Sequence, residues 1–347
     1  MYPYDVTFHP GWWNRYAGIE FDETFFFDET YRIEADMAMR RVLFDLFGAY
    51  GIGEKDPKPR PILFSDLIAC GFLYSELLGC KVTYTADDAP QVICASIPDE
   101  RIPTLQVPDL DSHPLWQKVQ RQIDAMLSRF GYVESAVNLM GIQNIALDLR
   151  GQALFLDYYD DDNLSVKLLE TACMLSIEIG KRLSAVSPVL SGGVTSIVKQ
   201  VLPRVYLTSN CSVTMISNAA YCRHLLPWDL RLARAFPCFG IHHCGNNLEN
   251  VIDGYLQVPQ LQFLEIGYGS DLEKVAAALR RHGRDDIACC IRYSPARLKN
   301  ACADEIRRET EATIRTFGTG ASLSFSCVGI DRDIPHEKVE AYLSVFA

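Results

Sequence analysis

Residues 239–247, Phe-Gly-Ile-His-His-Cys-Gly-Asn-Asn, form a short apolar run that passes into a turn, and a helical pattern follows it. The same succession of strand, turn and helix repeats from residue 204 to the end. The expected strands are 204–208, 239–243, 261–266, 286–292 and 321–327, and the expected helices are 218–236, 247–256, 271–282, 302–317 and 335–346. Strands that are apolar on both faces, each followed by a helix, predict a parallel sheet covered on both sides.

The preceding part of the chain adds further candidate elements. Strand-like runs occur at 61–65, 92–96 and 142–147, and helical patterns occur at 112–130 and 163–184. Together with the five later strands they make eight, the number that closes a TIM barrel. The fold expected from the sequence is therefore an α/β (β/α)8 barrel, with an open doubly wound sheet as the alternative.

Residues 1–60 precede this pattern, and we expect them to form a helical and aromatic extension that packs on a barrel made by residues 61–347. A helical pattern covers 29–47, and the prolines of Asp56-Pro-Lys-Pro-Arg-Pro61 end it because X–Pro steps disfavour helix. Trp12 and Trp13 are candidate substrate contacts, and the alternative is that they only pack against the barrel end.

The charge balance excludes several classes of partner. The chain of 347 residues has 33 Lys plus Arg against 44 Asp plus Glu, a net charge of −11, which argues against nucleic acid or an anionic membrane surface as partner.

No apolar run approaches the length of a membrane span, and the first residues do not resemble a signal peptide. Twelve scattered cysteines without disulfide-like spacing then predict reduced thiols in the cytoplasm, and a homo-oligomer is compatible with this composition.

The run at 239–247 carries a pair of metal ligands. Successive strand residues point to opposite faces, so His242 and Cys244 share a face that His243 does not. Zinc accepts both ligand types, and a catalytic zinc has three protein ligands and one open position. The alternative is a buried histidine beside an ordinary core cysteine.

Other polar residues are expected at the same end of the barrel. Active sites of TIM barrels lie at the carboxyl ends of the strands. Cys327, at the end of the last expected strand, is the candidate third ligand, although a small buried cysteine is the alternative. Glu265 is a candidate fourth ligand and catalytic residue, or else a carboxylate paired with an arginine. Candidates for orienting a substrate at this rim are Asn210, Asn246, Tyr268 and Asp66.

These residues also carry a family resemblance. His242-x-Cys244, the late Cys327 and Asp333-Ile-Pro-His-Glu-Lys-Val-Glu-Ala341 resemble the uroporphyrinogen decarboxylase superfamily, and within it the zinc-dependent corrinoid methyltransferase branch. That branch includes methylcobamide:coenzyme M methyltransferases and methoxyaromatic O-demethylases. Similar stretches occur at 146–151 and 208–227, so the resemblance extends over residues 60–347.

The resemblance implies a (β/α)8 barrel in which zinc supports methyl transfer between a small methylated substrate and a corrinoid. The methyl group would come from, or go to, a methoxyaromatic, a methylamine or a thiol. No cobalamin-binding Asp-x-His-x-x-Gly run occurs in this chain, so a partner corrinoid protein would supply the cofactor.

Residues 1–60 differ from the corresponding part of the decarboxylases. They lack the Met-Arg-Gln-Ala-Gly-Arg-type segment that handles substrate carboxylates there, which makes porphyrinogen decarboxylation a poor expectation. Two other classes stay open: a zinc-dependent lyase, decarboxylase or hydrolase of a small acid, and a non-enzymatic barrel with a structural metal or none.

Overall fold

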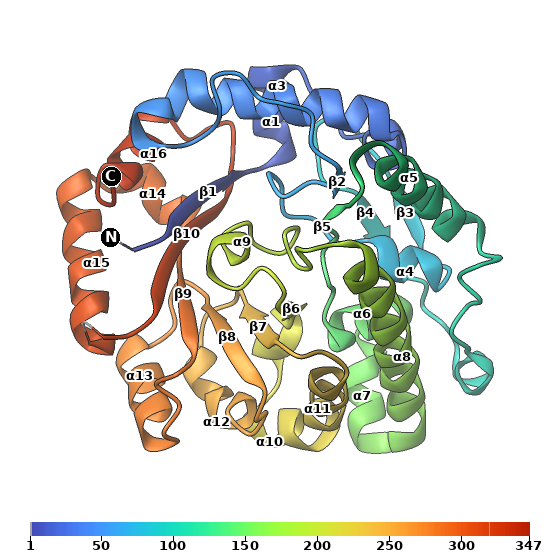
Figure 1. Ribbon diagram of the computed structural model, residues 1–347. Helices are drawn as coiled ribbons and strands as arrows, with labels where there is room; N and C mark the ends of the chain where they lie inside the picture. Colours follow the sequence, from blue (N-terminus) through green and yellow to red (C-terminus); the bar gives the residue numbers. More distant parts are fainter. Residues whose placement is uncertain (1, 319) are drawn as a thin grey trace.

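The main sheet of the protein is a curled, fully parallel sheet of six strands. The computed structural model describes residues 2–318 and 320–347. The strand order is β1-β10-β9-β8-β7-β6. The strands are β1 (Tyr4–Phe8), β6 (Tyr206–Ser209), β7 (Phe239–His243), β8 (Leu261–Ile266), β9 (Ala288–Tyr293) and β10 (Leu323–Ile330). Most helices lie outside the curved sheet (Figure 1), so the fold is α/β and TIM-barrel-like.

Two smaller strand pairs lie beside this sheet. β2 (Ile62–Phe64) pairs in parallel with β5 (Glu134–Ala136), and β3 (Lys81–Thr83) pairs antiparallel with β4 (Gln91–Ile93). The segment after β5 reaches the main sheet, because the Ser209 backbone N–H donates to the Leu139 carbonyl at 2.9 Å.

Several helices begin and end at residues with clear local signals. For example, α5 has Pro114 in its first turn and ends at Gly131, which has a φ of 80°. The helices are α1 (Pro10–Ala17), α2 (Glu23–Phe27), α3 (Glu29–Phe47), α4 (Leu73–Leu77), α5 (Pro114–Phe130), α6 (Ile142–Arg150), α7 (Ala153–Asp160), α8 (Asp162–Val186), α9 (Val198–Val201), α10 (Asn218–Ala220), α11 (Leu226–Ala235), α12 (Ile252–Tyr255), α13 (Leu272–Arg281), α14 (Pro295–Asn300), α15 (Ala303–Phe317) and α16 (His336–Leu343). The five strand–helix units expected after residue 204 are confirmed.

Two of the expected barrel strands are wrong. Residues 142–147 lie in α6, where Ile142, Ile145 and Leu149 are buried on one side with the helical period of 3.6. The run at 92–96 overlaps β4, which among the described residues pairs only with β3 and lies outside the parallel sheet. Three strands were not predicted, namely β1, β3 and β5; β3 and β5 have three residues each and are too short for a periodic signal.

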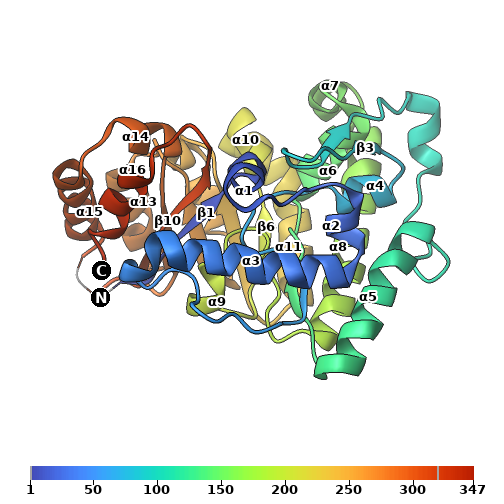
Figure 2. The ribbon, with the colours of Figure 1, turned by 90° about the horizontal axis from the view of Figure 1, so that it is seen from above.

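The N-terminal segment does more than pack on the barrel. β1 pairs in parallel with β10 and is therefore a strand of the main sheet. Figures 1 and 2 both show the two termini side by side, and the rings of Tyr4 and Phe346 stack at 5.3 Å. The division of the chain at residue 60 stays a prediction.

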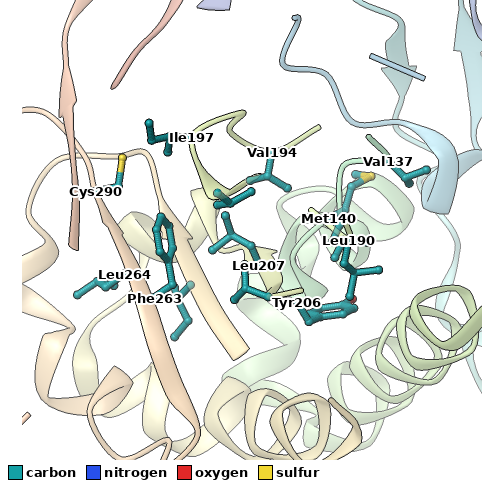
Figure 3. Close-up of a cluster of buried hydrophobic side chains, with 14 of the residues drawn as sticks. Val137, Met140, Leu190, Val194, Ile197, Tyr206, Leu207, Phe263, Leu264 and Cys290 are labelled. Atoms are coloured by element: carbon teal, nitrogen blue, oxygen red, sulfur yellow. The ribbon is translucent and has the colours of Figure 1, made fainter. Parts of the chain in front are cut away.

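The segment between α8 and β6 contributes to the apolar core. Its residues Val194 and Ile197 are buried and lie in one cluster with Leu207 of β6 and Phe263 of β8 (Figure 3). The close packing requires glycine at 193, where a Cβ atom would lie 1.9 Å from the Ala136 carbonyl oxygen. The Ser191-Gly-Gly193 turn is thus a packed part of the interior.

Candidate metal centre

A pair of neighbouring strands, β6 and β7, positions the candidate metal ligands. Ser209 is in register with His242, and the Asn210 backbone N–H donates to the His242 carbonyl at 2.8 Å. Directly beyond these strand ends, Cys211 opens a short 3-10 helix (Cys211–Met215) and Cys244 begins the turn after β7. Because parallel strands end at the same edge, the two cysteines come together there.

Cys211, His242 and Cys244 form a group in which the candidate ligand atoms all lie within 4.8 Å of one another. A tetrahedral zinc with sulfur and nitrogen ligands would separate such atoms by roughly 3.5–3.8 Å, given its usual bond lengths. His242 is buried, Cys211 is half-buried and Cys244 is exposed. The two sulfurs and one nitrogen could therefore hold a metal ion such as zinc, and the exposed Cys244 leaves the group open to solvent on one side.

Two buried residues on the next strands support His242. The His242 Nδ1 lies 2.6 Å from the Glu265 Oε2 on β8, and the other oxygen of this carboxylate accepts a hydrogen bond from the Arg292 Nη1 on β9 at 2.5 Å. The contact between His242 and Glu265 fixes the orientation of the imidazole and leaves its Nε2 as the nitrogen available to a metal. Both carboxylate oxygens of Glu265 are engaged by these contacts. Of the two alternatives expected from the sequence, the structure therefore shows the carboxylate paired with an arginine and not a free fourth ligand.

The protonation states of the group follow from these contacts. Burial by itself lowers the pKa of His242, but the Glu265 carboxylate and the Cys244 thiolate outweigh it and raise that pKa to about 9. Burial likewise acts to raise the pKa of Glu265, yet His242 and Arg292 lower it to about 2.

The Cys211 and Cys244 thiols shift each other's pKa in opposite directions. A hydrogen bond from the Cys211 thiol lowers the pKa of Cys244, assisted by the charge of His242, and the same contact raises the pKa of Cys211. A metal ion would bind with release of protons from this group, since its ligands must be deprotonated.

Cys327 does not belong to this group. It is completely buried in the middle of β10, where burial raises its pKa to about 12. Phe325, two residues earlier and hence on the same face, packs against Phe346 beyond α16 with ring centroids 5.0 Å apart. Cys327 therefore faces the helix layer. In place of Cys327, the third residue of the group is Cys211, which directly follows Asn210, a residue already expected at this rim.

His243 faces away from the group, as strand alternation predicts. Its Nδ1 lies 3.0 Å from the Tyr255 hydroxyl and its Nε2 lies 3.3 Å from the Asn246 carbonyl oxygen. Both ring nitrogens are thus engaged within the protein.

Several expected substrate contacts are instead engaged in packing. The buried Asn210 donates from Nδ2 to Asp229, which also accepts from the Tyr221 hydroxyl at 2.7 Å. Asp66 is buried between Arg60 and Lys199, and these cations lower its pKa strongly although burial opposes them. Both polar side chains are therefore engaged by neighbouring residues of the protein, and their role in binding a substrate stays a prediction.

Trp12 and Trp13 are fully buried. Trp12 stacks on Phe8 at 4.0 Å, and the Trp13 indole N–H donates to the Leu67 carbonyl at 3.1 Å. Their expected role as substrate contacts is therefore replaced by packing.

The two remaining candidates, Asn246 and Tyr268, lie near the exposed side of the group. Asn246 is exposed two residues after Cys244, and Tyr268 is 44% exposed on the turn that follows β8. These turns are adjacent, because a Cβ atom on Gly269 would lie 3.2 Å from that of Asn246. Their role in binding a substrate stays a prediction.

Comparison with known proteins bears on the fold. No protein-family model matches the sequence, and no curated protein matches it. Among the residues described, no helix is long and apolar enough to span a bilayer. The structure is similar to a methyltransferase from Methanosarcina mazei, with a TM-score of 0.65 and 15% identity over 98% of this chain and 90% of that chain. A B12-independent methionine synthase from Shewanella sp. W3-18-1 aligns over 99% of this chain and 95% of that chain, with a TM-score of 0.46 and 12% identity. The chain thus has the α/β fold of a known methyltransferase.

Proposed function

We propose that the protein is a zinc-dependent methyltransferase that moves a methyl group between a small methylated substrate and a corrinoid carried by a partner protein. The observation that carries this proposal is the Cys211–His242–Cys244 group at the ends of β6 and β7, backed by Glu265 and Arg292. The substrate classes are those that the resemblance implies: a methoxyaromatic, a methylamine or a thiol.

The donor set suits this chemistry. When bound at such a site, zinc deprotonates a coordinating thiol or acts as a Lewis acid on an ether oxygen. Two cysteine sulfurs supply negative charge, and the Glu265 carboxylate holds the imidazole in one orientation. Arg292 offsets the charge of Glu265. The exposed side at Cys244, with Asn246 and Tyr268 nearby, is where a substrate and the corrinoid would approach.

The fold adds support, because the similar Methanosarcina mazei protein is a methyltransferase. We further propose that β2 and β5 complete an eight-stranded barrel with the main sheet, joined through the parallel bridge between Met140 and Ser209. The remaining parts of the proposal are a cytoplasmic protein, compatible with a homo-oligomer, whose acidic surface is unsuited to nucleic acid.

The test is transfer of a methyl group to cob(I)alamin by the zinc-loaded protein. A panel of methoxyaromatics, methylamines and methylated thiols is mixed with the protein and reduced cobalamin, and formation of methylcob(III)alamin is followed by its absorption. At least one compound should react. Glu265→Gln should lower the rate by about 10–100-fold, because loss of a carboxylate behind a metal-binding histidine has effects of that order.

The exposed Cys94 provides a control for general effects of cysteine removal, and Cys94→Ala should react like the wild type. A protein that binds zinc but transfers no methyl group from any compound contradicts the proposal. Hydrolysis or decarboxylation of a small acid by the same preparation would then identify a metal-dependent lyase or hydrolase.

A further inference from the structure

The two sulfur atoms of the candidate metal centre lie close together. The Sγ atoms of Cys211 and Cys244 are within 4.8 Å of each other and of a ring nitrogen of His242. Both cysteines are free thiols in the structure. A pair of thiols with this separation can bind one metal ion together or, without the metal, can form a disulfide.

The backbone at the two cysteines suits a disulfide. Ser209 of β6 is in register with His242 of β7, and the Asn210 N–H donates to the His242 carbonyl at 2.8 Å, so the pairing extends past the strand ends. Cys211 and Cys244 each come two residues after this registered pair. Neighbouring strands lie about 4.7–4.9 Å apart, and a disulfide spans about 4.4–6.8 Å between Cα atoms. Rotation of the two side chains can therefore bring the sulfurs to bonding distance.

The segments that carry the two cysteines are held against each other. A Cβ atom on Gly245 would lie 2.1 Å from the Thr214 Cγ2, so the turn after β7 packs against the short 3-10 helix that starts at Cys211. Asn144 of α6 holds the same helix, because its Oδ1 accepts from the Ser212 backbone N–H at 3.1 Å and from the Ser212 hydroxyl at 2.5 Å. Two thiols held in this way have a high effective concentration toward each other, which favours a disulfide between them over a disulfide to a free thiol.

An oxidant can reach this pair from solvent. Cys244 is exposed and Cys211 is half-buried, so we expect the reaction to begin at Cys244 and to be completed by Cys211. The other exposed cysteines, Cys94 and Cys302, lie outside the candidate metal centre and can be removed separately.

We infer that the metal-free centre closes reversibly as a Cys211–Cys244 disulfide, so that zinc binding depends on the thiol–disulfide balance around the protein. The zinc part of this inference rests on the proposed function and adds a regulation of the same site. The disulfide itself requires neither zinc nor methyl transfer, because it depends only on the two sulfurs.

The oxidant is a small-molecule disulfide, such as glutathione disulfide. The Cys244 thiolate attacks one sulfur of this molecule, which breaks its S–S bond and releases one glutathione thiolate. The Cys211 thiol then gives up its proton, and its sulfur attacks that of Cys244 and releases the second glutathione. The protein loses two electrons and two protons, and one glutathione disulfide becomes two glutathione molecules. The oxidised centre keeps only His242 as a ligand and should not hold zinc.

The test uses the full-length protein, stripped of metal by a chelator and checked for folding by circular dichroism. It is incubated with glutathione disulfide, and its disulfides are mapped by mass spectrometry of proteolytic peptides. The peptides that contain Cys211 and Cys244 should become linked, and dithiothreitol should restore both thiols.

Two variants define the order of events. In Cys211→Ser the bond cannot close, so Cys244 should accumulate a mixed disulfide with glutathione, which should be a minor species in the wild type. Cys94→Ala/Cys302→Ser lacks the two other exposed thiols and should link Cys211 to Cys244 as the wild type does.

Zinc connects this test with the proposed function and keeps the two apart. The zinc-loaded wild type should form the linkage at least about tenfold more slowly, because the bound metal occupies both thiolates. The linked protein should bind no zinc until it is reduced, as measured with a chromophoric zinc indicator. Formation of the linkage in a protein that never binds zinc would uphold the disulfide and refute the zinc-dependent function.

The inference is overturned if the folded, metal-free wild type keeps both thiols free, or if glutathione stays attached to Cys244 although Cys211 is present. It is equally overturned if a protein that holds zinc forms the linkage as fast as the metal-free protein does. All three outcomes are measured on the wild type and do not depend on the folding of a variant.

Discussion

At the scale of single residues, the most consequential one is Cys211. Its thiol lies with His242 and Cys244, whereas Cys327 is buried against the helix layer. Cys211 and Cys327 have the same chemistry and differ in the direction in which their side chains point. Removing each cysteine in turn therefore gives a direct test of the metal centre.

Cys211→Ala and Cys244→Ala should each lose most of the bound zinc, from about one ion per chain in the wild type, because two ligands hold zinc far less tightly than three. Cys327→Ala should keep its zinc. Metal analysis of zinc-supplied, desalted preparations measures this. Retention of zinc by Cys211→Ala together with its loss from Cys327→Ala would restore the ligand set expected from the sequence.

Asp5 is a second residue with an unusual environment. It lies on β1, its Oδ2 accepts from the Ser196 hydroxyl, and its Oδ1 has no partner among the described residues. Burial raises its pKa to about 6, with the Glu265 carboxylate adding to the effect while Ser196, Ser326 and Arg292 oppose it. In the folded state Asp5 therefore keeps its proton to a higher pH, up to about 6, than a free aspartate does.

A raised folded-state pKa means that Asp5 contributes stability at low pH and that this contribution is lost as the pH rises from about 4 through about 6. A rise of the pKa from 3.8 to about 6 corresponds to about 3 kcal/mol, at about 1.4 kcal/mol per pH unit. Asp5→Asn should thus gain stability relative to the wild type between pH 4 and pH 7, as measured by urea unfolding. A constant difference across this range would show that Asp5 is ionised in the folded protein.

At the scale of elements, the segment between α8 and β6 shows how closely a connecting segment packs in this fold. Ser191 donates to the Val205 carbonyl at 2.5 Å and accepts from the Leu207 backbone N–H at 2.9 Å. Val194 and Ile197 then reach the apolar cluster of Figure 3. The segment behaves as a structural element although it contains little regular structure.

Gly193→Ala should lower the free energy of unfolding by about 1–3 kcal/mol, the usual cost of overpacking, because its Cβ atom would collide with the Ala136 carbonyl oxygen. Gly320→Ala is the matched control, since nothing lies within 4 Å of its Cβ position. Thermal unfolding of both variants and the wild type measures the effect. Equal midpoints for the two variants would contradict the packing described.

At the scale of the whole molecule, strand pairing and buried hydrogen bonds connect the N-terminal segment 1–60 to the rest of the chain. β1 pairs with β10, and the buried Arg32 of α3 donates to the Ile62 carbonyl at 2.8 Å and to the Gln122 side chain at 2.5 Å. Removing the segment 1–60 would leave β10 with a bare edge and expose the apolar surface under α3.

A chain that starts at residue 61 should consequently lack a cooperative unfolding transition. Circular dichroism and differential scanning calorimetry of this fragment, beside the full chain, measure the outcome. A cooperative transition near the midpoint of the full chain would instead support residues 61–347 as an independent domain.

Much of this structure follows from local sequence patterns. The helical period and its end signals predicted α3, α5 and α8 closely, and the apolar runs after residue 204 predicted five strands. Where the pattern was ambiguous it failed: the buried residues of α6 suggested a strand, and the three residues of β5 were too few to be recognised. A short apolar run does not distinguish the period of a helix from that of a strand.

For the site, the sequence by itself determined that His242 and Cys244 share a face, because alternation along a strand is a local property. It also determined that polar residues gather where the parallel strands end. Only the tertiary structure decided that Cys211 joins them and that Cys327 faces the helices, since this depends on where each strand ends and on how neighbouring strands pair. Packing between distant segments sets the register of the strands and the direction in which each side chain points. No pattern within one segment can predict them.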